Sequence, residues 1–189
     1  MDSFLQSLVD ALQQTQSHLV LTLGFIGILY AIQILNVLVG YRLNVLGIWP
    51  RHFFGLIGIP FSPLLHGNFQ HLILNTLPLF VFSNFILLQG QMILIHVTVI
   101  IVVLSGALIW LFGRSAIHIG ASALIMGYLG FISIGVYHQP TALSIIVALV
   151  CVFYFGSLFI NLLPSHDKYV SWEGHVFGFI SGIAAAWLI

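Results

Sequence analysis

The chain has 189 residues, of which 60% are hydrophobic and only 4% are charged, and its mean hydropathy is +1.16. A soluble domain carries roughly a quarter charged residues because its surface faces water, so four basic and four acidic side chains exclude a water-facing exterior and point to lipid. The net charge of zero leaves no basic patch, which argues against nucleic acid as a partner.

The N-terminal residues have acidic Asp2 and Asp10 and no basic start, so we do not expect a cleavable signal peptide. Their apolar side chains recur at helical spacing. This pattern is typical of a short amphipathic helix lying in the membrane interface, and a plain cytosolic cap fits it nearly as well.

Polar clusters and helix breakers then divide the chain into six stretches, most of them close to the 20 or so residues that cross a hydrocarbon core. We place these helices near residues 19–40, 69–89, 91–113, 122–138, 140–161 and 174–189. Short turns at 88–91 and 137–140 predict that the helices flanking each turn are antiparallel neighbours. Strands are excluded, because an open sheet edge in lipid would leave backbone groups unpaired. With no internal repeat, we expect an all-α membrane protein of one domain, 1–189.

Two predicted connections are too polar to cross a membrane. The first, residues 41–68, combines two arginines, two histidines and three of the six prolines with many aromatic and aliphatic side chains. This mixture fits a long loop half sunk in the interface, where aromatic rings lie at headgroup depth. The second, residues 162–173, contains charged side chains and a tryptophan, and is a candidate for a mobile cover.

The basic residues all lie in loops that follow the first, third and fifth predicted helices: Arg42, Arg51, Arg114 and Lys168. The positive-inside rule would place this side of the protein in the cytoplasm. Four charges are a small sample, so sidedness stays open on this evidence.

Strongly polar groups are expensive within a membrane unless they face a cavity or a partner, so each suggests a function. Three such clusters open the second, fourth and sixth predicted helices. His71 and Asn75 are four residues apart and share one helix face, Ser122 follows a small-residue turn at Gly120, and His175 opens the last helix. In a six-span bundle these helix starts lie on one side of the membrane, so we expect the clusters to converge.

Two of these helices also carry small residues along one face. They are Gly174, Gly178 and Gly182 in the last helix, and Ala123, Gly127 and Gly130 in the fourth. Small residues at this spacing let helix backbones approach closely. Close packing of the two helices would bring Ser122 within reach of His175.

The residue types suit acyl transfer. A serine hydroxyl becomes a nucleophile when a base takes its proton, and neutral histidine is the usual base near neutral pH. The charge that develops on the carbonyl oxygen needs fixed donors, for which the Ser122 backbone N–H, the Asn75 amide and the His71 imidazole are candidates. No carboxylate is obvious as a third member, so a Ser122–His175 dyad is the simplest interpretation.

Each cluster has a structural interpretation too. Alone, a Gly-x-Ser sequence in a membrane helix is usually a packing site, and His71 with Asn75 would serve equally well as a hydrogen-bonding contact between helices. Their joint occurrence at three helix starts favours catalysis. His96 and His118 have no partner pattern, and we interpret them as structural.

These residues resemble the rhomboid family of intramembrane serine proteases. The resemblance covers nearly all of the chain and rests on four stretches: Pro50-Arg51, 63–76, Gly120-Ala121-Ser122 and 171–178. It implies a six-helix bundle in which Ser122 is the nucleophile, His175 the base, and His71 with Asn75 the oxyanion-stabilising pair. It also implies that His66 and Arg51 support the loop structure around the site.

The same resemblance implies cleavage of single-span membrane proteins within the bilayer, with no metal and no cofactor. In bacteria it implies the inner membrane and a site toward the non-cytoplasmic side, which the basic residues contradict; we favour the family orientation. Two positions depart from the family pattern. Ala123 stands where the family usually has glycine, and Met126 where it often has a tyrosine that stacks on the catalytic histidine. A thioether still packs on an imidazole, so we expect lowered or altered activity.

The alternative is a rhomboid-like protein that binds membrane clients without cutting them, which predicts loss of the serine or the base, and both are present. A small transporter would need acidic residues on facing helices, whereas Asp167 lies in a loop and Glu173 at a helix edge. A zinc protease would need a His-Glu-x-x-His run, which the sequence lacks.

Overall fold

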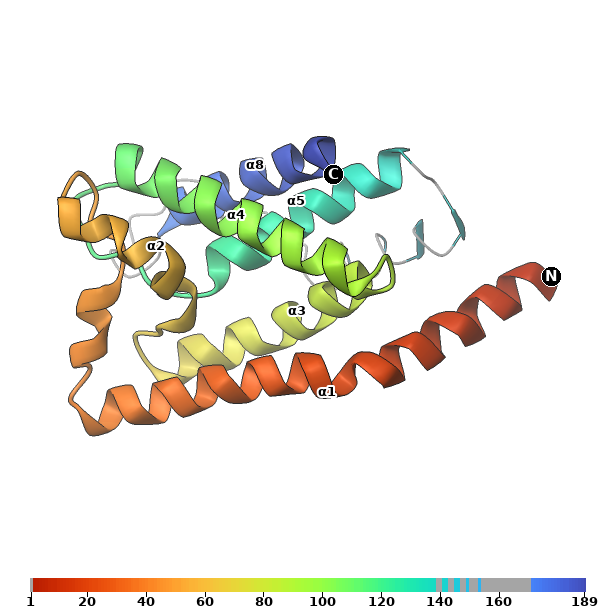
Figure 1. Cartoon of the computed structure of the whole chain (residues 1–189), viewed down its shortest axis with the longest axis horizontal. Coiled ribbons are helices and arrows are strands. Elements are labelled where there is room, and N and C mark those ends of the chain that lie inside the picture. Colours follow the sequence, from red (N-terminus) through yellow and green to blue (C-terminus); the bar gives the residue numbers. More distant parts are fainter. Residues whose placement is uncertain (1, 139–140, 143–144, 147–148, 150–152, 154–170) are drawn as a thin grey trace.

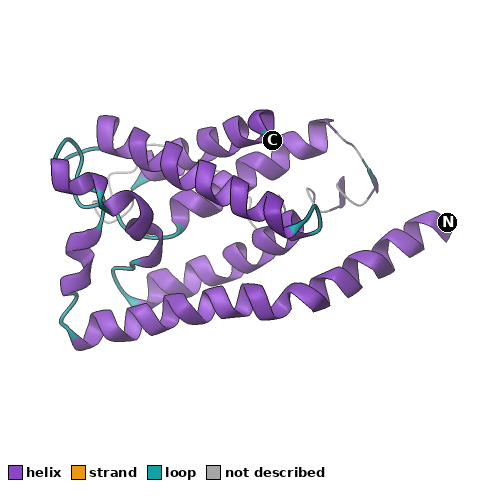
Figure 2. Ribbon diagram, viewed as in Figure 1, coloured by secondary structure: helices purple, strands orange, loops and turns teal. Residues whose placement is uncertain are grey.

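The structure is a computed structural model that describes residues 2–138, 141–142, 145–146, 149, 153 and 171–189 (Figure 1). Its long helices are α1 (Asp2–Leu38), α3 (Phe69–Leu87), α4 (Gln91–Phe112), α5 (Ser122–His138) and α8 (Trp172–Leu188). Between α1 and α3 lie four short helical elements: η1 (Arg42–Leu46), η2 (Phe53–Leu56), α2 (Gly58–Phe61) and η3 (Ser62–Leu64). In this part of the chain, β pairing is limited to one antiparallel bridge between Ile48 and His118. Figure 2 shows the described residues as helices joined by loops.

Four of the predicted helices coincide closely with helices of the structure. The stretches predicted at 69–89, 91–113, 122–138 and 174–189 are α3, α4, α5 and α8, with ends shifted by two residues or fewer. As predicted from the short turn at 88–91, α3 and α4 run in opposite directions (Figure 1). The predicted helix at 140–161 and the connection at 162–173 fall largely outside the described residues.

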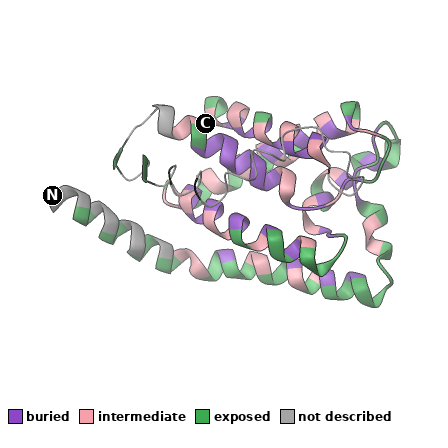
Figure 3. Ribbon diagram, turned by 180° about the vertical axis from the view of Figure 1, so that it is seen from behind, coloured by how far each residue is buried: buried purple, intermediate pink, exposed green. Residues whose placement is uncertain are grey.

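The first helix differs from the prediction. Helix α1 runs without a break from Asp2 to Leu38, so the expected amphipathic helix is the beginning of α1 and not a separate element. The sequence has no proline or glycine before Gly24, so nothing there interrupts the helical hydrogen bonds. The N-terminal part of α1 extends beyond the other helices (Figures 1 and 3).

Three helices in the described part are long and apolar enough to cross a membrane: Gln16–Leu38 within α1, α3 and α4. Helix α5 has a shorter apolar stretch, Ser122–Gly135. Large apolar side chains on the outer faces are exposed, for example Val20 at 83% and Leu74 at 66%. Faces of this kind are stable against lipid rather than water, so the chain is an integral membrane protein.

Helix α5 lies at the centre of the bundle. It packs against α3, α4 and α8, while α1 packs on the outside of α3 (Figure 1). Most of the residues along the first part of α5 are buried (Figure 3). The starts of α3, α5 and α8 point toward the same end of the molecule, at the left of Figure 1.

The predicted close contact between α5 and α8 is confirmed. A methyl group at Gly178 would collide with the carbonyl of Ala123, and one at Gly182 would collide with the carbonyl of Gly127. The two backbones therefore touch along the small-residue faces of both helices. Since Ala123 follows Ser122 directly, this contact fixes the start of α5 against α8.

The segment between α1 and α3 packs against the C-terminal end of α4. Arg51 donates its backbone N–H to the Trp110 carbonyl at 2.9 Å, and a methyl group at Gly106 of α4 would meet the Ile59 side chain at 2.6 Å. Phe53 and Phe54 point outward, with exposures of 79% and 81%. The segment thus rests on α4 and presents two aromatic rings to its surroundings.

Candidate active site

Ser122 is the first residue of α5 and follows a tight turn at Gly120 and Ala121. Gly120 has a φ of +116°, a conformation that side-chain-bearing residues rarely adopt. A methyl group at this position would also lie 2.7 Å from Cε1 and 3.0 Å from Nε2 of His71. Two separate reasons therefore require glycine at position 120. The His71 imidazole packs directly on the turn that carries Ser122.

His66 and Ser62 bind the same turn through hydrogen bonds. The Ser62 carbonyl accepts a hydrogen bond from the Gly120 N–H at 2.9 Å, and Nε2 of His66 accepts one from the Ala121 N–H at 3.5 Å. Since Nε2 accepts, the His66 imidazole is neutral. Burial of the ring and then the nearby His71 lower the pKa of His66 to about 4. Its ring lies edge-on to that of His71, with the centroids 5.2 Å apart.

His71 and Asn75 lie one turn apart at the beginning of α3. This helix is capped by Asn68, whose side-chain oxygen accepts from the His71 N–H at 2.8 Å. Asn75 is only 8% exposed, and its amide nitrogen has no hydrogen-bond partner among the described residues. A buried donor of this kind is free to bind an oxygen atom that comes from outside the protein.

His175 lies in the first turn of α8 and is 8% exposed. Ser171 caps this helix by accepting a hydrogen bond from the Gly174 N–H at 3.2 Å. The His175 ring lies close enough to His71 for the two imidazoles to interact electrostatically. The structure thus places the starts of α3, α5 and α8 together, as the sequence predicts.

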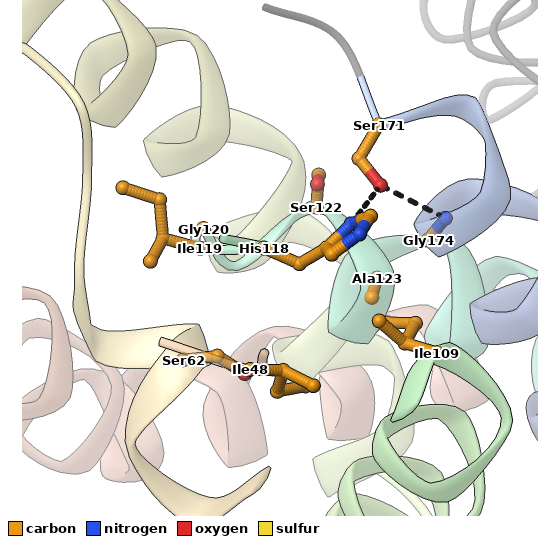
Figure 4. A pocket seen from close by; sticks show the side chains of 10 residues that line it. All are labelled: Ile48, Ser62, Ile109, His118, Ile119, Gly120, Ser122, Ala123, Ser171 and Gly174. Carbon is orange, nitrogen blue, oxygen red and sulfur yellow. Dashed lines mark hydrogen bonds between the residues drawn. The ribbon is translucent and has the colours of Figure 1, made fainter. Parts of the chain in front are cut away.

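A small cavity of about 20 Å³, enough for about one water molecule, lies beside the starts of α5 and α8 (Figure 4). Its lining includes Ser122 and Ala123 from α5, Gly174 from α8 and Ile109 from α4. The remaining lining residues come from the connecting segments: Ile48, Ser62, His118, Ile119, Gly120 and Ser171. The hydroxyl of Ser122 is therefore next to a space that can hold water.

His118, which we interpreted as structural without a partner pattern in the sequence, has a side-chain partner in the structure. Its Nδ1 lies 2.7 Å from Oγ of Ser171, and both side chains line the cavity beside Ser122 (Figure 4). The two residues are 53 positions apart, so no local pattern in the sequence could have paired them.

Of the predicted site residues, Ser122 and Gly120 line the cavity, whereas the others do not: His66, His71, Asn75, His175, Arg51 and Met126. Arg51 donates from Nη1 to the Gly113 carbonyl at 2.7 Å and from Nη2 to Oγ of Ser115 at 3.1 Å, so it binds the chain just after α4. Met126 lies one turn along α5 from Ser122 and is buried in the core at 1% exposure. Within the described ranges, no group of three His, Cys, Asp or Glu side chains is arranged to hold a metal ion.

The chain matches a known protein family and several known proteins. A family model described as a rhomboid domain matches residues 50–189. An uncharacterized protein of Mycobacterium tuberculosis and one of Mycobacterium bovis are each 37% identical over 175 residues, covering 88% of this chain and 73% of the relative. An uncharacterized protein of Mycobacterium leprae is 35% identical over 175 residues, covering 88% of this chain and 69% of the relative.

Proposed function

Because the chain belongs to the rhomboid family, we propose that it is a serine endopeptidase that cleaves the transmembrane segments of other membrane proteins. Ser122 is the nucleophile and His175 the general base in this proposal. The finer features of the family are proposed with it: six spans, an interfacial loop at 41–68, single-span substrates, and a bacterial inner-membrane location with the site toward the non-cytoplasmic side.

The proposed reaction begins when His175 takes the proton of the Ser122 hydroxyl and Oγ attacks the substrate carbonyl carbon. The resulting oxyanion accepts hydrogen bonds from the Ser122 N–H, the Asn75 amide and the His71 imidazole. The carbon–nitrogen bond then breaks, and His175 returns the proton to the amine. A water molecule, for which the cavity beside Ser122 has room, hydrolyses the ester with His175 again acting as the base.

The convergence of the three helix starts supports this proposal most. Helices α5 and α8 touch along their backbones at Ala123 and Gly178, directly beside Ser122 and one turn from His175. The His71 ring packs on the turn before Ser122, and the amide nitrogen of Asn75 is buried without a partner in the described part of the chain. A helix packing site alone does not need an unpaired amide donor.

Ala123 supports the alternative, a rhomboid-like protein that binds membrane clients without cutting them. This residue lines the cavity, and its carbonyl is pressed against Gly178, so its methyl group has little freedom to move aside. The space next to Ser122 is correspondingly smaller than it would be with glycine.

The test uses protein purified in detergent, a fluorophosphonate probe and a reporter whose transmembrane segment contains glycine, since glycine weakens helices. Wild type is compared with Ser122→Ala and His175→Ala. The matched control is Ser181→Ala, which removes a buried hydroxyl of α8 that bonds to the Phe177 carbonyl at 2.7 Å. We expect labelling and cleavage in wild type and the control, and neither in the two site variants. Folded wild type that neither labels nor cleaves would favour the binding alternative.

A further inference from the structure

A second histidine–serine pair lies next to the proposed dyad. Nδ1 of His118 is 2.7 Å from Oγ of Ser171, and the same oxygen accepts the Gly174 N–H at 3.2 Å (Figure 4). His118 precedes Ser122 by four residues, and Ser171 precedes His175 by four. The pair therefore joins the segment that enters the serine helix to the cap of the histidine helix.

The direction of each hydrogen bond in this pair follows from its partners. Nε2 of His118 lies 3.1 Å from the Arg114 carbonyl, which only accepts, so the ring proton is on Nε2. Nδ1 is then a bare acceptor, and the Ser171 hydroxyl must donate to it. The lone pair left on Oγ of Ser171 accepts from Gly174. A neutral His118 imidazole is therefore consistent with all three of these hydrogen bonds.

Other contacts hold the two segments that carry His118 and Ser171. His118 is 5% exposed, and its backbone exchanges two hydrogen bonds with Ile48, at 2.9 and 3.0 Å. Burial lowers the pKa of His118, with Arg114 and Glu173 as the charged groups that act on it, and this favours the neutral ring that the contacts require. Arg114 and Glu173 also join the same two segments, with Nε and Oε1 separated by 3.7 Å.

We infer that His118 and Ser171 are positioning residues: together they fix the first turn of α8, and thereby the His175 ring, relative to Ser122. The inference rests on the proposed function for its catalytic consequence. A displaced base costs rate even when it makes no contact with the substrate, because proton transfer depends on the distance between the two heavy atoms.

Two substitutions of His118 separate its contacts. His118→Asn places an amide oxygen near the position of Nδ1 and keeps an acceptor for Ser171, whereas His118→Gln reaches the position of Nε2 and keeps only the Arg114 contact. We expect His118→Asn to approach wild type. His118→Gln and Ser171→Ala should each lower kcat and the rate of fluorophosphonate labelling about tenfold or more, with KM unchanged. The double variant with His118→Gln and Ser171→Ala should lower kcat no further than either single substitution does.

Equal kcat values for His118→Asn and His118→Gln would overturn the inference. A rise in KM at constant kcat would overturn it too, since that pattern indicates direct contact with the substrate.

Hydrogen exchange of the backbone amides at 172–176 tests the positioning without any activity. The Gly174 N–H bonds directly to Oγ of Ser171, so exchange there should become about tenfold faster in His118→Gln and Ser171→Ala and stay near wild type in His118→Asn. Identical exchange in all four proteins would overturn the inference whatever the activity. If wild type neither labels nor cleaves but the variants show the expected differences in exchange, the result would support the positioning inference and refute the protease proposal.

Discussion

The side chain of Asn75 is buried while its amide nitrogen lacks a partner in the described part of the structure. Leaving a buried donor unpaired costs about 1–3 kcal/mol, which a substrate oxyanion would offset during catalysis. We therefore expect Asn75→Ala to lower kcat on the order of 100-fold, with no loss of thermal stability. Reporter cleavage and the melting temperature in detergent measure the two effects.

Asn84 provides the matched control, since it is also buried in α3 but donates from Nδ2 to the Phe80 carbonyl at 2.9 Å. Asn84→Ala removes a made hydrogen bond, so it should reduce the free energy of unfolding by about 1 kcal/mol and leave kcat near wild type. An Asn75→Ala protein with unchanged kcat would show that the amide does not bind the oxyanion.

His66 makes stability depend on pH. Burial and then the nearby His71 lower its pKa from 6.5 to about 4 in the folded protein, while the unfolded chain titrates near 6.5. Between these values the unfolded state binds a proton that the folded state does not. The free energy of unfolding is therefore unaffected by this group above pH 6.5. It falls as the pH decreases toward 4, by an amount on the order of 3 kcal/mol.

His66→Gln is the variant that measures this effect, because its amide oxygen can still accept from the Ala121 N–H but does not titrate. Melting temperatures from pH 7 to pH 4.5 should fall less steeply for His66→Gln than for wild type. Other groups that titrate in both proteins cancel in this comparison. Parallel curves would mean that the pKa of His66 is the same in the folded and unfolded states.

The sequence predicted the residues that converge at the site better than it predicted the contacts that hold them. Ser122, His71 and His175 stand at helix starts, and helix starts can be located from polar clusters in an apolar chain. The contacts of His118 with Ser171 and of His66 with Ala121 join residues more than 50 positions apart. Periodicity is local and carries no information about such pairs.

At the scale of elements, helices bounded by polar or small residues were predicted almost to the residue, such as α5 at 122–138. The membrane span predicted at 19–40 corresponds to Gln16–Leu38 within α1. The separate amphipathic helix expected before it was wrong, because a helix continues until its hydrogen bonding is interrupted. The segment 41–68 was predicted only as a loop. Its short helical turns depend on tertiary contacts such as Gly58 against the backbone of Gly47, which no local signal reveals.

The α5–α8 contact should be intolerant of a single methyl group. Gly178→Ala would place a carbon against the Ala123 carbonyl and force the helices apart, which separates Ser122 from His175. We expect a loss of about 1–3 kcal/mol in unfolding free energy and a fall in kcat of at least tenfold. Thermal unfolding and reporter cleavage measure these two changes.

Gly24→Ala in α1 is the control, because a methyl group there meets nothing within 4 Å. Alanine favours a helix over glycine by roughly 0.5–1 kcal/mol, so this variant should be unchanged or slightly more stable. The two substitutions therefore have opposite expected signs. A Gly178→Ala protein as stable and active as wild type would contradict the backbone contact.

For the whole molecule, the unresolved conflict is between the basic residues and the family orientation. Two of the arginines at the site end have structural partners: Arg51 binds the Gly113 carbonyl, and Arg114 is 3.7 Å from Glu173. The fold thus accounts for both positions without reference to topology. Only some of the basic residues at this end are then evidence for sidedness. The positive-inside rule therefore has less weight here than four basic residues would suggest.

Cysteine labelling in intact bacterial cells measures sidedness directly. Cys151, the single cysteine of the sequence, is first replaced by serine. Gly67→Cys then places a thiol at the exposed site end, where a side chain meets nothing within 4 Å. Gln89→Cys places one in the exposed turn between α3 and α4. With the site toward the non-cytoplasmic side, a membrane-impermeant maleimide should label Gly67→Cys in intact cells and Gln89→Cys only after lysis. The reverse pattern would place the site in the cytoplasmic half of the membrane, and substrates would then have to be cut near their cytoplasmic ends.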